Sequence, residues 1–175
     1  MAGELRPASE QPKPMRFIAM ENSESTKTTP TTVTHQPDQG VFREIRTEDV
    51  QWRSFAAFPS GARLAVLVGD PTKPEPYVIR VHLPDGTRMM PHRHIEDRIY
   101  TVISGVFYIG LGDTFDENKL TAHAPGSVVV LPAGQAHFHW ARSGDYVTQV
   151  SAIGPLGLAY VDAAHDPRNA ASRRG

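Results

Sequence analysis

The sequence predicts an all-β fold, a sandwich or barrel of about ten short strands. Two observations support this prediction. Short apolar segments alternate with turns that contain glycine and proline, and no segment of convincing length has the helical period. A single helical turn starting at Thr47 is the exception that we expect. The 175 residues suffice for one domain with its own hydrophobic core.

The expected strands follow one another with short connections. Alternation is clearest at 77–83, where four apolar side chains share one face. The Ser104-Gly105 turn between two apolar segments predicts a hairpin. The expected strands are 63–69, 77–83, 98–104, 106–111, 127–131, 137–140, 146–152 and 158–161.

The two ends of the chain differ from this central part. Residues 1–40 contain prolines and threonines without a periodic apolar pattern, which predicts a flexible N-terminal arm or an arm that becomes ordered against a partner. The barrel is expected to span 41–163. Residues 164–175 are polar and are expected to form a frayed C-terminal tail.

Composition argues against several classes of partner. With 18 basic and 19 acidic residues, a net charge of −1 and no basic stripe, no nucleic-acid partner is expected. The absence of cysteine excludes disulfides, thiolate metal sites and cysteine nucleophiles. The start of the chain has no signal-peptide pattern, and the most apolar stretch, 99–111, is too short to span a bilayer. No membrane partner is therefore expected, and a cytoplasmic location is the default expectation.

Three histidines are candidate metal ligands. Alternate side chains of a strand share a face, so His92 and His94 point the same way and can converge on one ion. His137 follows a Pro-Ala-Gly turn on a second strand-like segment and is the expected third ligand. Histidine ligands suit one divalent transition metal per chain, with iron, zinc, manganese and nickel as candidates.

The spacing around these histidines resembles the two motifs of the cupin superfamily. The first motif, G(X)5HXH(X)3–4E(X)6G, corresponds to Gly86, His92, His94, Arg98 and Gly105. The second motif, G(X)5PXG(X)2H(X)3N, corresponds to Gly126, Pro132, Gly134, His137 and Ala141. The resemblance covers 86–141 and implies a cupin double-stranded β-helix, a jelly-roll barrel with the three histidines as metal ligands.

Two positions depart from these motifs. Arg98 stands where the family has a metal-binding Glu, and Ala141 stands where it has Asn. A guanidinium stays protonated and cannot bind a metal. The resemblance therefore implies either a three-histidine site or a site in which Glu96, which has the strand parity of His94, supplies a fourth ligand.

Four side chains are candidates for the substrate pocket. Arg98 is expected either to hold a substrate anion, as a catalytic residue, or to pair with a neighbouring carboxylate. Tyr100 faces the cavity by alternation from Arg98, as a pocket wall and, less favoured, as a catalytic acid. His139 is expected either to line the cavity or to lie at its rim. Gln149 is expected either to hydrogen-bond a ligand or to be an ordinary exposed strand residue.

Three function classes follow from the resemblance. Three-histidine cupins include dioxygenases, which implies an Fe(II) dioxygenase acting on a small-molecule substrate. Neutral ligands leave the metal its positive charge, so that substrate is expected to be anionic. The alternatives are a metal-dependent lyase or isomerase that acts by Lewis-acid catalysis, and a non-catalytic ligand- or zinc-binding module. Cupins often pair between barrels, so a homodimer is also expected.

Overall fold

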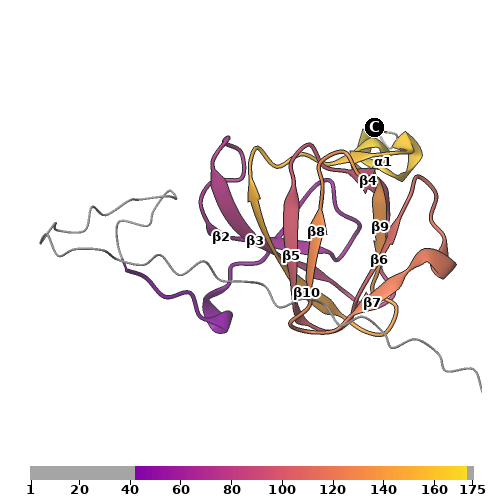
Figure 1. The fold of residues 1–175 in the computed structure, drawn as a ribbon. Helices are drawn as coiled ribbons and strands as arrows, with labels where there is room; N and C mark the ends of the chain where they lie inside the picture. The colour runs from indigo at the N-terminus through magenta and orange to yellow at the C-terminus, as the bar shows by residue number, and fades with distance from the viewer. Residues whose placement is uncertain (1–41, 173–175) are drawn as a thin grey trace, which may run out of the picture. The chain divides into compact units, whose positions relative to one another are not determined.

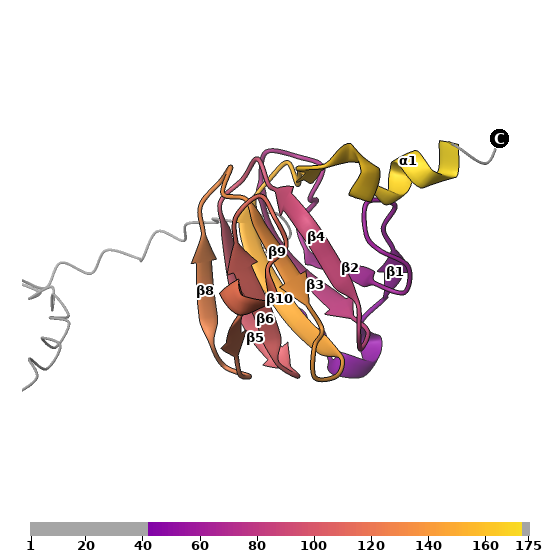
Figure 2. The same cartoon turned by 90° about the vertical axis from the view of Figure 1, so that its right-hand side faces the viewer.

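The structure is a computed structural model that describes residues 42–172. The expected N-terminal arm and the end of the expected tail, 173–175, lie outside the described residues. Within 42–172 the chain forms two antiparallel sheets, as Figure 1 and Figure 2 show, which confirms the all-β prediction. The strands are β1 (Arg53–Ser54), β2 (Arg63–Val68), β3 (Pro76–Leu83), β4 (Arg88–Arg93), β5 (Arg98–Ser104), β6 (Phe107–Leu111), β7 (Thr121–His123), β8 (Val128–Leu131), β9 (His137–Trp140), β10 (Tyr146–Ile153) and β11 (Ala159–Tyr160).

Strand pairing brings distant parts of the sequence together. The six-stranded sheet has the order β1-β2-β3-β10-β5-β8, and the five-stranded sheet has the order β11-β4-β9-β6-β7. In the second sheet β4 pairs with β9 in a register that places His92 opposite His137. The pairing therefore sets two of the three expected metal ligands side by side.

The alternation expected at 77–83 appears in β3. Its apolar side chains Tyr77, Ile79, Val81 and Leu83 are buried, and the residues between them are partly exposed. They pack in a core with inward-facing side chains of both sheets, including Phe107 of β6. Full burial of one such aliphatic side chain stabilises the fold by about 1.5–3 kcal/mol.

The prediction of a hairpin around Ser104-Gly105 is wrong, because β5 and β6 do not pair with each other. β5 pairs with β8 and β10 in one sheet, whereas β6 pairs with β7 and β9 in the other. Gly105 has a φ of +70°, and a Cβ there would lie 2.0 Å from the carbonyl oxygen of Asp145. The turn therefore carries the chain from one sheet to the other, past a backbone that only glycine can approach so closely.

The C-terminal segment differs from the expected frayed tail. A 3-10 helix at Ala163–His165 is followed by α1 (Pro167–Ser172). The Asp162 side chain accepts a hydrogen bond from the Ala164 N–H at 2.8 Å, and Arg168 donates to the Leu158 carbonyl at 3.1 Å. The first bond caps the 3-10 helix, and the second ties the segment to the chain just before β11. The helical turn expected at Thr47 is present as a 3-10 helix, and no helix in 42–172 is long and apolar enough to cross a membrane.

Candidate metal centre

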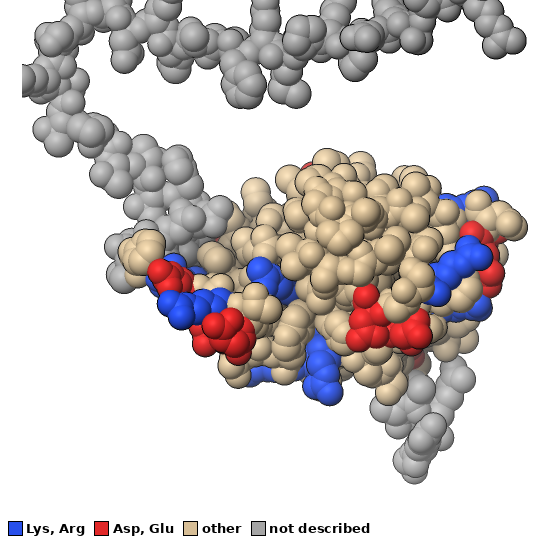
Figure 3. All heavy atoms as spheres, turned by 90° about the horizontal axis from the view of Figure 1, so that it is seen from below, with Lys and Arg blue, Asp and Glu red and all other residues tan. Residues whose placement is uncertain are grey.

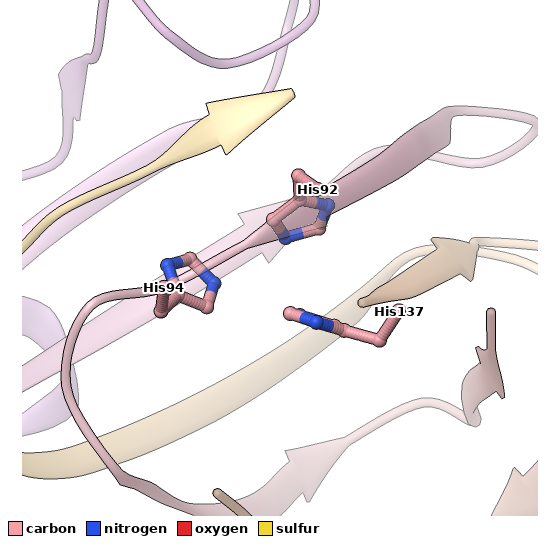
Figure 4. Close-up of side chains that lie close together, drawn as sticks. All are labelled: His92, His94 and His137. Atoms are coloured by element: carbon pink, nitrogen blue, oxygen red, sulfur yellow. The ribbon is translucent and has the colours of Figure 1, made fainter. Parts of the chain in front are cut away.

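The three histidines predicted as ligands come together inside the barrel. His92 lies on β4, His94 lies just beyond the end of that strand, and His137 begins β9. All three are buried, and one potential ligand atom from each lies within 4.8 Å of the other two. Figure 4 shows the three rings turned toward a common point. This group could hold a metal ion.

Hydrogen bonds fix which ring nitrogen faces that point. Each Nδ1 lies 2.6–3.0 Å from a backbone carbonyl oxygen, and these carbonyls belong to Met90, Gly157 and Gln135. A carbonyl only accepts, so the neutral ring carries its proton on Nδ1 and leaves a lone pair on Nε2. The Nε2 atoms of His92 and His137 are buried and have no hydrogen-bond partner. Unpartnered lone pairs of this kind fit a divalent transition metal.

The surroundings keep the three rings neutral. Burial is the main cause that lowers the pKa of His92, His94 and His137, and for His137 the value falls to about 4. The positive charge of Arg98 adds to the effect on all three rings. Metal binding needs the neutral imidazole, so the site is in its binding form at neutral pH.

The Pro-Ala-Gly turn of the second motif, 132–134, is hydrogen-bonded to residues 93–97 of the first motif. The Gly134 N–H donates to the His94 carbonyl at 2.8 Å, and Arg93 donates to the Gly134 carbonyl at 2.6 Å. The Ala133 N–H donates to the Asp97 carboxylate at 2.6 Å. These bonds explain how two motifs about forty residues apart in the sequence set one ligand group.

Glu96 lies outside the converging group, and Arg98 is its partner. Glu96 Oε1 accepts hydrogen bonds from the Tyr77 hydroxyl at 2.9 Å and from the Arg98 guanidinium, and Oε2 accepts from the Gly157 N–H at 3.1 Å. Burial alone would lower the pKa of Arg98, but Tyr100, Tyr77 and Glu96 together raise it above its usual value. Of the alternatives left open by the sequence, the geometry favours a three-histidine site and an Arg98 paired with a carboxylate.

One predicted pocket residue, His139, lies beside the candidate ligands, and a second, Tyr100, has its ring centroid 6.0 Å from that of His139. Tyr100 is buried, and its hydroxyl has no hydrogen-bond partner. The His139 ring centroid lies 5.0 Å from that of His137, and its Nε2 is also buried without a partner. His139 Nδ1 lies 3.4 Å from the Tyr146 hydroxyl.

Gln149 does not lie in the pocket. Its neighbours on β10, Thr148 and Val150, are buried, whereas Gln149 is on the opposite, outer face and accepts a hydrogen bond from Arg80 at 3.3 Å. This is the ordinary strand position that the sequence left as the alternative. Sequence reasoning also missed Tyr77 and Gly157, which contact the site from segments outside both motifs and carry no motif signal of their own.

No family model matches the chain, and no curated protein matches it. Among solved structures, the polyketide cyclase RemF from Streptomyces resistomycificus has a TM-score of 0.61 and 15% identity, covering 75% of this chain and 94% of that chain. The DMSP lyase DddQ from Ruegeria pomeroyi DSS-3 has a TM-score of 0.52 and 18% identity, covering 64% and 61%. A sugar phosphate isomerase from a cupin superfamily, from Silicibacter pomeroyi DSS-3, has a TM-score of 0.52 and 15% identity, covering 67% and 81%.

These similarities identify the class of protein by its fold. The chain has the cupin fold, which confirms the fold expected from the two motifs. Its three-histidine group lies where the motif histidines meet inside that fold and could hold a metal ion. Solved structures similar in fold include enzymes named as a cyclase, a lyase and an isomerase.

Proposed function

We propose that this chain is a metal-dependent enzyme that acts on an anionic small molecule. The observation that carries the proposal is the group of three buried, neutral histidines with converging ligand atoms, two of which, His92 Nε2 and His137 Nε2, are buried without a hydrogen-bond partner. His92, His94 and His137 would hold the ion. When bound there, a divalent ion supplies Lewis acidity and, in the case of iron, redox chemistry with O2.

The charge of the site favours an anionic substrate. The three histidines contribute no negative charge, and the nearby Arg98 is already balanced by Glu96. A divalent ion would therefore keep its positive charge in a buried setting, where an anion is its natural partner. His139 Nε2 and, next to the His139 ring, the Tyr100 hydroxyl are buried without a hydrogen-bond partner, and we assign them to hydrogen bonds with polar atoms of the substrate.

Two reaction types are candidates for this site. The first is an Fe(II) dioxygenase, because three neutral protein ligands leave coordination positions for both a chelating substrate and O2. The second is a lyase or isomerase that uses the ion as a Lewis acid. The second candidate gains support from the named activities of the lyase and the isomerase that share the fold. A non-catalytic binding module is what remains for this site if neither reaction is found.

An oxygen-consumption assay distinguishes the two reactions. Iron-loaded protein is screened with diketones, thiols and catechol-like acids, and zinc- or manganese-loaded protein is screened anaerobically with carbonyl-containing acids. We expect turnover in one screen that is lost in His92→Ala. Turnover that persists in folded His92→Ala would contradict the assignment of the site, and no turnover in either screen would leave a binding module as the better account.

We further propose that the chain forms a homodimer through the outer face of its six-stranded sheet. This outer face exposes aliphatic side chains from β5, β8 and β10, namely Ile99, Ile103, Val128, Val130 and Ile153. A groove of about 990 Å³ lies at one end of this face, and none of the three candidate ligands lines it. Figure 3, which views the barrel from below, shows that charged side chains also leave a broad uncharged area at that end of the molecule. A second copy suits this face because it is nearly uncharged, and a contiguous exposed apolar patch marks an interaction site.

Light scattering tests the homodimer directly. We expect wild-type mass near twice that of one chain, and near one chain for Ile99→Lys/Val130→Lys, because two copies would then bury lysines against each other. Val161→Lys, an exposed aliphatic-to-lysine change just beyond β11 of the other sheet, serves as the matched control and should leave the mass unchanged. A monomeric wild-type protein would contradict the proposed interface.

A further inference from the structure

We propose that Gly157 is a positioning residue for the metal ligand His94, and that only glycine allows this position to hold the ligand in place. The proposal rests on the proposed function, because it concerns the same histidine site. Gly157 lies in the segment 154–158 between β10 and β11, outside both sequence motifs.

Three consecutive residues, 94–96, which we call the ligand segment, contact Gly157. Its carbonyl oxygen lies 2.6 Å from His94 Nδ1, and its N–H donates to Glu96 Oε2 at 3.1 Å. Between these two contacts the side chain of Ile95 lies against its Cα position. The carbonyl contact fixes the ring proton of His94 on Nδ1 and so presents the Nε2 lone pair to the ion. One residue thereby holds the ligand and the carboxylate that pairs with Arg98.

A side chain at this position would collide with Ile95. A Cβ at Gly157 would lie 2.6 Å from Ile95 Cγ1, 2.9 Å from Cδ1 and 3.3 Å from Cγ2. Because Ile95 is β-branched, every χ1 rotamer leaves at least one carbon in the two γ positions that lie nearest Gly157. Either Ile95 leaves its rotamer or the backbone of one segment shifts, and the two segments are joined by the hydrogen bonds to His94 and Glu96.

The segment 154–158 is also held from its other side. The Leu156 N–H donates to the Pro71 carbonyl at 2.7 Å, and the Gly154 N–H donates to the Glu75 carbonyl at 2.9 Å. A Cβ at Gly154 would lie 2.2 Å from the carbonyl oxygen of Lys73, so the two backbones are in close contact there. Segment 154–158 cannot move away from Ile95 without breaking its bonds to Pro71 and Glu75. A backbone shift is therefore expected to displace the Gly157 carbonyl from His94 Nδ1.

A four-protein comparison tests the proposal. Wild type, Gly157→Ala, Ile95→Ala and the double variant are compared for Zn(II) affinity by competition with a chromophoric chelator. We expect Gly157→Ala to bind zinc about tenfold to a hundredfold more weakly, as for loss of other groups that orient a ligand. Ile95 is 69% exposed, so Ile95→Ala should stay within about twofold of wild type, and its removal should restore most of the affinity in the double variant.

Gly144→Ala is the matched control. Gly144 has a φ of +110°, and no atom lies within 4 Å of the position that a Cβ would take, so alanine there strains the backbone far from any collision. It should lower the melting temperature without changing zinc affinity. A folded Gly157→Ala protein with wild-type affinity would overturn the proposal, and so would a double variant that binds zinc no better than Gly157→Ala.

Nitrogen NMR of the metal-free protein separates this proposal from the proposed function. The His94 ring should report a single Nδ1–H tautomer in wild type, a mixture in Gly157→Ala, and the single tautomer again in the double variant. If wild type bound no metal, the proposed function would fail, and the tautomer readout alone would decide the role of Gly157. If Gly157→Ala did not fold, the double variant would have to fold with the wild-type tautomer, and any other result there would overturn the proposal.

Discussion

Replacing Arg98 with methionine is expected to destabilise the folded chain by about 3–5 kcal/mol, the usual cost of leaving a buried charge without its partner. The side chains of Arg98 and Glu96 are only 4% and 5% exposed. The substitution removes both guanidinium hydrogen bonds and leaves the Glu96 carboxylate with only the Tyr77 hydroxyl and the Gly157 N–H. Those two neutral donors do not compensate a buried negative charge.

Urea unfolding of the metal-free protein measures this cost. Glu96→Gln leaves the opposite charge unpaired and should cost a similar amount, whereas Glu96→Gln/Arg98→Met buries no charge. The double variant should therefore be more stable than the sum of the single changes implies, by at least about 2 kcal/mol. Arg46→Met, in a pair with Glu44 whose side chains are 67% and 60% exposed, should stay within about 1 kcal/mol of wild type. An Arg98→Met cost below about 1 kcal/mol, or strictly additive changes, would refute the reasoning.

Two further predictions concern the buried polar groups of the site. The metal-free protein should lose stability as pH falls below about 6.5, because burial lowers the pKa of His92, His94, His137 and His139 in the folded chain and unfolding then takes up protons. The free energy of unfolding should fall by up to about 1.4 kcal/mol per pH unit for each histidine. For His137 this fall should stop near pH 4, where the folded chain also takes up the proton. Urea titrations at several pH values should show that the free energy of unfolding changes less with pH in His139→Gln than in wild type. Equal pH dependence in the two proteins would count against the prediction. Tyr100→Phe should leave stability unchanged or raised, because its hydroxyl has no partner, yet it should weaken substrate turnover; a loss of more than about 1 kcal/mol would show an unseen hydrogen bond.

The fold was predictable where local patterns decide it. The alternation at Tyr77 to Leu83 follows from the two-residue period of a strand and matches the buried face of β3. The short strand β7 was missed because its sequence, Thr121 to His123, has no apolar alternation to mark it. The hairpin at Gly105 was wrong because a turn signal fixes where the chain reverses, not which strands it joins. Strand partners depend on contacts far apart in the sequence.

The candidate site was predictable for the ligands and not for their support. His92, His94 and His137 are found by spacing, since strand parity and two motifs place them on, or just beyond, two paired strands of one sheet. The sequence does not decide the role of Glu96, because strand parity puts its side chain on the interior side without saying whether it meets a metal or Arg98. Gly157 could not be found, because its contact with His94 depends on a connection between β10 and β11 whose path no local pattern fixes.

The metal content of the purified protein, measured by inductively coupled plasma mass spectrometry, tests the central claim most directly. Wild type should carry close to one divalent transition metal per chain after reconstitution, and folded His137→Ala should carry little, because one of three ligands is lost. His123→Gln, a histidine outside the candidate site, should keep the wild-type content. Equal metal in wild type and His137→Ala, or no metal in wild type even after reconstitution, would contradict the account.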